Sequence, residues 1–167
     1  MNVIEHQSNK SVTLEQLASA KGVTVNFLQQ QGLWEHSDGI VIPYFSTRQR
    51  LRTSVSAKGS KWLPFDGGLP PEPYGLWKLH EAVKAGYLIM VEGESDTLTL
   101  WCNNLPALGV PGANMAHTLQ RHYLEKIKKL FVVQEADQGG IAFVKSVAER
   151  LKELHWSGDA FVIRMPL

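Results

Sequence analysis

The sequence is almost without cysteine and has no long apolar run, and each absence excludes a class of protein. Cys102 is the only cysteine among 167 residues, so a disulfide framework and a cysteine-rich zinc site within this chain are excluded. No apolar run approaches the ~20 residues of a membrane helix, and residues 1–10 lack the apolar centre of a signal peptide. We therefore expect a cytoplasmic protein with no membrane partner.

A strong net charge is also absent, but the charged residues are unevenly distributed. The net charge is +1, and 44% of the residues are hydrophobic, which predicts a folded core. Acidic residues cluster at 92–96 and at 135–137. The segment 48–61 has no acidic residue and holds five basic ones: Arg48, Arg50, Arg52, Lys58 and Lys61. This pattern predicts a basic segment and a separate acidic site.

The first half of the chain predicts two small segments. Thr13 and Gln16 form a capping-box pattern, so we expect a short helix that stops at Gly22, then a second from about 24 to 31. These helices make residues 1–38 a short helical appendage. Residues 40–45 and 51–55 read as paired strands, and the Gly/Pro-rich stretch 67–73 as a loop. Residues 39–80 are then a basic, β-containing subdomain and linker.

Residues 81–167 have the pattern of an α/β domain. Short apolar runs at 87–91, 107–110, 130–133 and 160–163 alternate with helical segments near 95–103, 118–128 and 140–154. Strands alternating with helices at this spacing predict right-handed βαβ units and a parallel sheet. The expected fold class is α/β, with a small, mainly parallel, Rossmann-like sheet flanked by helices.

Acidic residues follow two of these strands. Glu92 ends the first apolar run and Asp96 follows it, while Glu135 and Asp137 follow the third run. Parallel sheets bind ligands beyond the carboxyl ends of their strands, so we expect these carboxylates to meet. Their oxygen ligands suit Mg²⁺ or Mn²⁺, with Glu92 as the general acid or base.

Ordinary structural roles also account for some of these acids. Ser95 or Asp96 can cap the helix that follows, and both functions can coexist in Asp96. We expect Glu94 to be a solvated side chain. Glu135 and Asp137 can form a polar turn, although the Gly139-Gly140 pair after them favours a tight passage into a helix.

The order of these motifs resembles the TOPRIM domain of bacterial-type primases, topoisomerases and some nucleases. The matching residues are Glu92-Gly-x-x-Asp96, then Gly109-x-x-Gly112, then Glu135-x-Asp137-x-Gly139-Gly140. The segments 42–44, 48–52, 61–63 and 73–76 look like the basic region that precedes TOPRIM in primases. Gly93-Glu-Ser-Asp96 and Gly109-Val-Pro-Gly-Ala113 are most similar to phage and plasmid primases, which are often fused to helicases.

The resemblance implies a role for each matching residue. Glu92 would be catalytic, and Glu135, Asp137 and Asp96 would bind Mg²⁺ or Mn²⁺. Arg48, Arg50, Arg52, Lys58 and Lys61 would contact nucleic acid, and Trp62 would stack on a base. The implied function is a primase core that joins ribonucleoside triphosphates on single-stranded DNA, with a helicase domain or protein as partner.

Two other functions stay open. A TOPRIM nuclease would use the same metals to cut DNA, and a non-catalytic module would bind nucleic acid with a residual metal site. A topoisomerase is disfavoured because no tyrosine has an obvious nucleophile context. Upstream zinc modules of primases are missing here, so we expect this chain to work within something larger.

Overall fold

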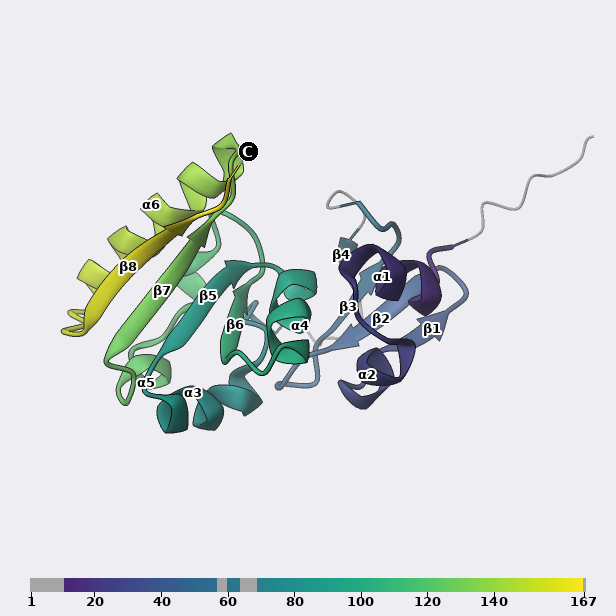
Figure 1. Cartoon of the computed structure of the whole chain (residues 1–167), viewed down its shortest axis with the longest axis horizontal. Helices are drawn as coiled ribbons and strands as arrows, with labels where there is room; N and C mark the ends of the chain where they lie inside the picture. Colours follow the sequence, from purple (N-terminus) through teal and green to yellow (C-terminus); the bar gives the residue numbers. More distant parts are fainter. Residues whose placement is uncertain (1–10, 57–59, 64–68, 167) are drawn as a thin grey trace, which may run out of the picture. The chain divides into compact units, whose positions relative to one another are not determined.

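The computed structural model describes residues 11–56, 60–63 and 69–166, without the side chains of Ser60 and Trp62. The chain divides into two compact units, each described by itself. The first comprises residues 1–43 and 48–66, and the second comprises residues 44–47 and 67–167 (Figure 1). None of the described helices is long and apolar enough to cross a membrane.

The first unit combines two helices with an antiparallel sheet. Its elements are α1 (Leu14–Lys21), α2 (Val25–Gln30), β1 (Trp34–His36), β2 (Gly39–Pro43), β3 (Gln49–Arg52) and β4 (Ser60–Trp62). The strands pair in the order β1-β2-β3-β4, all antiparallel. The capping box of Thr13 and Gln16 is present, and Gly22 ends α1 with φ 63°, as the sequence predicted.

The predicted boundary after residue 38 does not separate two compact units. β1 lies before this boundary and pairs with β2 after it. The Glu35 carboxylate of β1 also accepts a hydrogen bond from the backbone N–H of Leu14, at 2.8 Å. The N-terminal helices therefore belong to the same unit as the β-containing subdomain.

The second unit contains the predicted parallel sheet. Its strands are β5 (Leu88–Glu92), β6 (Ala107–Val110), β7 (Lys129–Gln134) and β8 (Asp159–Arg164). They pair in the order β6-β5-β7-β8, and every pair is parallel. The helices are η2 (Leu76–Lys78), α3 (Leu79–Ala85), α4 (Glu94–Cys102), η3 (Ala116–Thr118), α5 (Arg121–Leu124) and α6 (Gln138–Glu153). This confirms the expected α/β fold class.

The two faces of the parallel sheet are covered differently. Alternate strand residues such as Leu88, Met90 and Leu130 point into the main core, which also holds Phe143 and Val147 of α6. α4 packs against β5 and β6 from the opposite face (Figure 1). All six residues of the edge strand β8 are exposed. Within the described part of the chain, β8 is thus exposed on both of its faces.

Candidate active site

The first acid stands where β5 turns into α4. Glu92 is the last residue of β5, and Gly93 follows with φ 82°, a conformation that glycine adopts at little cost. The Gly93 N–H donates to the Val110 carbonyl at 2.7 Å, so the turn is tied to the end of β6. Glycine is also required opposite the turn, because a Cβ on Gly109 would lie 2.5 Å from the Gly93 carbonyl oxygen. This packing fixes the backbone that carries Glu92.

The start of α4 differs from the prediction in two respects. The helix begins at Glu94 with Gly93 as its N-cap, and no side chain caps it. Asp96 and Ser95 are therefore not capping residues, and Asp96 lies in the first turn. Glu94, expected to be solvated, is only 3% exposed and accepts a hydrogen bond from the Tyr44 hydroxyl. Its place directly after the turn glycine directs it into the unit, where it supports the start of α4.

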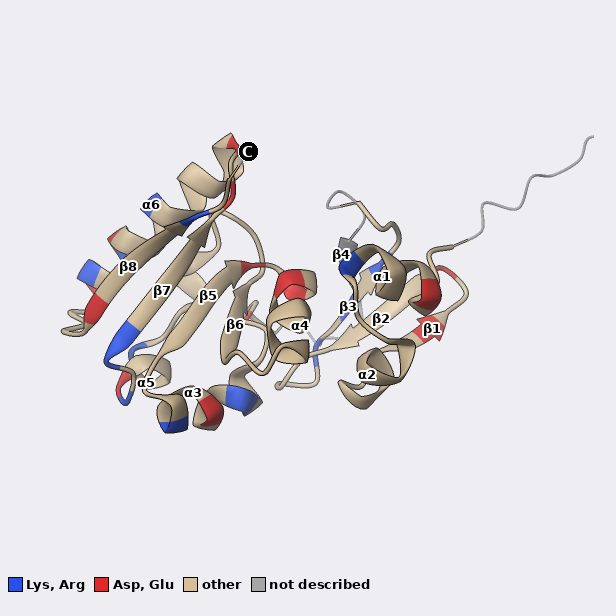
Figure 2. Ribbon diagram, in the orientation of Figure 1, with Lys and Arg blue, Asp and Glu red and all other residues tan. Residues whose placement is uncertain are grey.

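The second acidic segment follows β7. Glu135 and Asp137 are both exposed, and Asp137 is the N-cap of α6. The Gly140 N–H donates to Asp137 Oδ1 at 2.8 Å. Gly140 itself packs tightly on the preceding segment, because a Cβ there would lie 2.2 Å from the Glu135 carbonyl oxygen. Figure 2 shows acidic residues both where β5 meets α4 and where α6 begins.

The structure brings the acids from the two strand ends together. Glu92, Asp96 and Glu135 line one cavity of about 440 Å³ at the carboxyl edge of the sheet. Burial raises the pKa of Glu92 above its ordinary value, and the charge of Glu135 raises it further. Asp137 and Asp96 act on this pKa in the same direction, while a hydrogen bond from the Ala113 backbone lowers it. The four predicted carboxylates therefore share one electrostatic environment.

This set of oxygen donors matches the chemistry of Mg²⁺ or Mn²⁺. Within the described parts of the chain, no three acidic, histidine or cysteine side chains are close enough together to enclose an ion. The assignment of Glu92, Glu135, Asp137 and Asp96 to a metal ion therefore stays a prediction.

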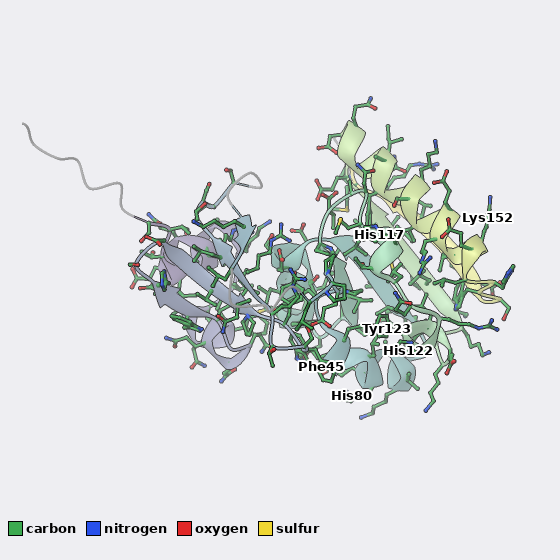
Figure 3. All side chains as sticks on the ribbon, turned by 180° about the vertical axis from the view of Figure 1, so that it is seen from behind. Phe45, His80, His117, His122, Tyr123 and Lys152 are labelled. Carbon is green, nitrogen blue, oxygen red and sulfur yellow. The ribbon has the colours of Figure 1, made fainter. Side chains whose placement is uncertain are left out.

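Two histidines of the second unit lie away from the acids. His80 of α3 and His122 of α5 line a separate cavity of about 350 Å³ together with Tyr123 (Figure 3). The ring of His122 contacts that of Tyr123, with centroids 4.3 Å apart. These side chains do not extend the carboxylate site.

The residues that were predicted to contact nucleic acid differ in their burial. Arg48 and Arg52 are each only 5% exposed, and Arg52 donates to the carbonyls of Ser54 and Val55 at 2.9 and 2.6 Å. This burial does not support a phosphate contact and gives Arg52 a structural role. Arg50 is half-buried and Lys61 is exposed. Lys58 and the side chain of Trp62 lie outside the described residues.

The sequence analysis missed a buried aromatic cluster behind the site. Tyr74 is fully buried and its ring contacts Tyr44, Trp77 and Trp101 with centroids 5.2 Å apart in each pair. Burial, reinforced by the charge of Glu94, raises the pKa of the Tyr74 hydroxyl. The backbone of Tyr74 exchanges hydrogen bonds with Gly109. Tyr74 and Trp77 were a usable signal in themselves, because large aromatic side chains bury much of their area in folded proteins.

The fold is that of bacterial primase domains. No family model matches the chain. Three similar solved structures are a DNA primase domain from Pseudomonas aeruginosa, the zinc-binding and RNA polymerase domains of the Aquifex aeolicus primase, and the E. coli primase catalytic core. Their TM-scores are 0.63, 0.63 and 0.59, at 17%, 19% and 14% identity. They cover 84%, 83% and 84% of this chain.

The chain corresponds to a part of each of these proteins. It spans 50%, 39% and 52% of the three solved chains. A curated relative, the Gene 57 protein of Mycobacterium phage D29, is 32% identical over 79 residues, which is 47% of this chain and 48% of the relative. The likeness in structure confirms the fold that the TOPRIM resemblance implied.

Proposed function

We propose that this chain is the catalytic core of a primase, which joins ribonucleotides on single-stranded DNA for replication. The observation that carries the proposal is the convergence of Glu92, Asp96, Glu135 and Asp137 at the carboxyl edge of the parallel sheet. Such an edge is where α/β sheets bind ligands. The primase fold of the similar structures supports the same function.

In this proposal the residues divide the work of nucleotidyl transfer. A bound Mg²⁺ or Mn²⁺ would neutralise charge on the phosphates during in-line displacement. Glu135, Asp137 and Asp96 would hold the ion. Glu92 would accept the proton of the primer hydroxyl, while the hydroxyl oxygen bonds to the α-phosphorus and the bond from that phosphorus to pyrophosphate breaks. Its raised pKa brings Glu92 closer to the range in which a base is efficient.

The DNA template would contact the first unit through exposed basic side chains. Lys61 of β4 is exposed and pairs with Leu51, whereas the half-buried Arg50 of β3 pairs with Trp62, so Lys61 is the better placed of the two for a phosphate contact. Phosphate contacts of this kind make binding strongly dependent on salt. A helicase domain or protein remains our proposed partner.

Primer synthesis with radiolabelled ribonucleotides on single-stranded DNA tests the proposal. We expect labelled primers from the wild type and a loss of 10²-fold or more, roughly, in Glu92→Gln. Asp137→Asn is the matched variant at the metal site, because asparagine keeps the N-cap of α6 while removing the charge. Full activity in both variants contradicts the assignment. Degradation of DNA without nucleotides identifies a nuclease, and binding without turnover a non-catalytic module.

A further inference from the structure

The cavity that Glu92, Asp96 and Glu135 line is otherwise mostly apolar. Its remaining lining residues come from β5, α4, β7 and the segments after β7 and β8: Val91, Thr99, Leu100, Val133, Ala136 and Met165. Five of these six side chains are aliphatic or thioether groups. Such a surface does not help to bind a hydrated cation or phosphates, and apolar area exposed to water is unfavourable.

The apolar surface is a continuous part of the sheet. Met90 pairs with Val132, so Val91 and Val133 are neighbours on the face opposite the main core. Val133 pairs in turn with Ile163, which is 40% exposed. The Met165 N–H donates to the Gln134 carbonyl at 3.0 Å, which fixes Met165 beside this row. The side chain of Met165 is 50% exposed.

The described apolar residues of this lining have no side-chain group that could recognise a ligand by hydrogen bonds. Thr99 is the one hydroxyl in the lining, and it donates to the Ser95 carbonyl of its own helix at 3.0 Å. The other polar lining groups are the carboxylates of Glu92, Asp96 and Glu135. A ligand in the cavity therefore meets both cation-binding oxygens and apolar side chains that offer van der Waals contacts.

A nucleotide has this combination of chemical properties. Its phosphates bind at carboxylates through a divalent cation, and its base has an apolar π-face that stacks without regard to sequence. A methionine sulfur near a ring adds a favourable contact. The cavity volume of about 440 Å³ lies in the range of small-molecule sites.

We propose that Leu100, Val133 and Met165 form a stacking surface for the base of the nucleotide whose phosphates lie at the acids. This inference rests on the proposed function and extends it to the position of the base. The surface contacts the face of the base and leaves its pairing edge to the template. All four ribonucleotides should therefore bind within a few-fold of one another when no template is present.

Calorimetric titration of the full chain in Mn²⁺ tests this inference. The probes are ATP, CTP and inorganic triphosphate, and the variants are Leu100→Gln and Met165→Gln. Ile141→Gln is the control, since Ile141 is as exposed as Met165, at 51%, but lies on α6 outside the cavity lining. We expect each cavity variant to bind both nucleotides about tenfold more weakly, because the base no longer covers one apolar side chain. Binding of inorganic triphosphate should not change.

Several results of the titration would overturn the inference. Unchanged nucleotide binding in both variants, equal weakening of triphosphate, or wild-type nucleotide binding no tighter than triphosphate shows that the apolar surface does not hold the base. If the variants change only the oligomeric state in sedimentation, the apolar surface is a protein-binding face. Primer synthesis separates the two claims. If the protein makes primers but binds nucleotides no more tightly than triphosphate, only the stacking surface is contradicted. If the base strengthens binding but no primers form, only the primase proposal is contradicted.

Discussion

The carbonyl oxygen of Glu135 lies where a side chain at position 140 would have to be. A Cβ on Gly140 would come within 2.2 Å of this oxygen and 2.5 Å of the Glu135 nitrogen. Both obstacles are backbone atoms, which cannot move aside as a flexible side chain can. The glycine therefore allows the first turn of α6 to pack on the segment that carries Glu135 and Asp137.

Gly140→Ala should destabilise the protein and displace the acidic segment. Overpacking at a close contact costs roughly 1–3 kcal/mol, which chemical denaturation measures directly. Gly139→Ala is the matched control, because its Cβ would approach only the Asp137 carboxylate, at 3.2 Å. Equal stability of the two variants contradicts the role given to Gly140.

The raised pKa of Glu92 predicts a pH-dependent stability without metal. A carboxyl whose pKa is raised in the folded state favours folding when protonated, and this contribution is lost as pH rises through its folded pKa. Glu92→Gln should therefore raise Tm of the metal-free protein at pH 7. The difference should shrink as pH falls towards the ordinary pKa of 4.5. A Tm difference that is independent of pH argues against this account of Glu92.

Divalent metal should stabilise the wild type more than the Glu92→Gln variant. Mn²⁺ that binds only the folded state raises Tm more the more tightly it binds, and the neutral amide of the Glu92→Gln variant is a weaker ligand than the carboxylate. We expect a larger Mn²⁺-induced rise in Tm for wild type than for Glu92→Gln, measured by scanning calorimetry. The same shift in both proteins indicates that the ion binds elsewhere.

Tyr44→Phe removes the hydroxyl that donates to the buried Glu94. A buried acceptor that loses its donor costs about 1–3 kcal/mol, so the free energy of unfolding in urea should fall by this amount. Val83→Ala is a control at an exposed apolar position of α3 and should lower it far less. Wild-type stability in Tyr44→Phe shows that Glu94 does not depend on this hydrogen bond.

Changing Arg52 to alanine should affect stability, whereas changing Lys61 to alanine should affect DNA binding. Arg52→Ala removes two hydrogen bonds to backbone carbonyls and should lower stability. Lys61→Ala should leave Tm unchanged, weaken binding of oligo(dT) and reduce the salt slope by about 0.7. Fluorescence anisotropy over a salt series measures this. A Lys61→Ala variant with the wild-type slope removes Lys61 from the interface.

The parallel sheet was predictable because each of its central strands is a continuous apolar run. The run 87–91 and the strand Leu88–Glu92 differ by one residue at each end. The segment after β6 was predicted less well: one helix over 118–128 was expected, whereas η3 and the four-residue α5 are present. Ala116, Leu119, Leu124 and Ile127 are buried in the main core, and tertiary packing of this row overrides helix propensity.

The candidate site could be predicted only to the level of the backbone. Strand ends and turn glycines placed Glu92 and Glu135 at one edge, because the sheet geometry follows from local pattern. Burial of Glu94 could not be inferred, since it depends on a partner that no local periodicity reveals. Arg52 donates to carbonyls only two and three residues further on, and such backbone contacts of a side chain leave no pattern in the sequence. Tyr44 is 50 residues away from Glu94 in sequence.

The anomalous scattering of Mn²⁺ in crystals of the protein would show directly where the ion binds. We expect an ion at the carboxyl edge of the sheet, within about 2.1–2.3 Å of oxygens from Glu135 and Asp137 and close to Glu92. An ion bound away from these three carboxylates, or a lysine or arginine side chain occupying the space between them, contradicts this expectation.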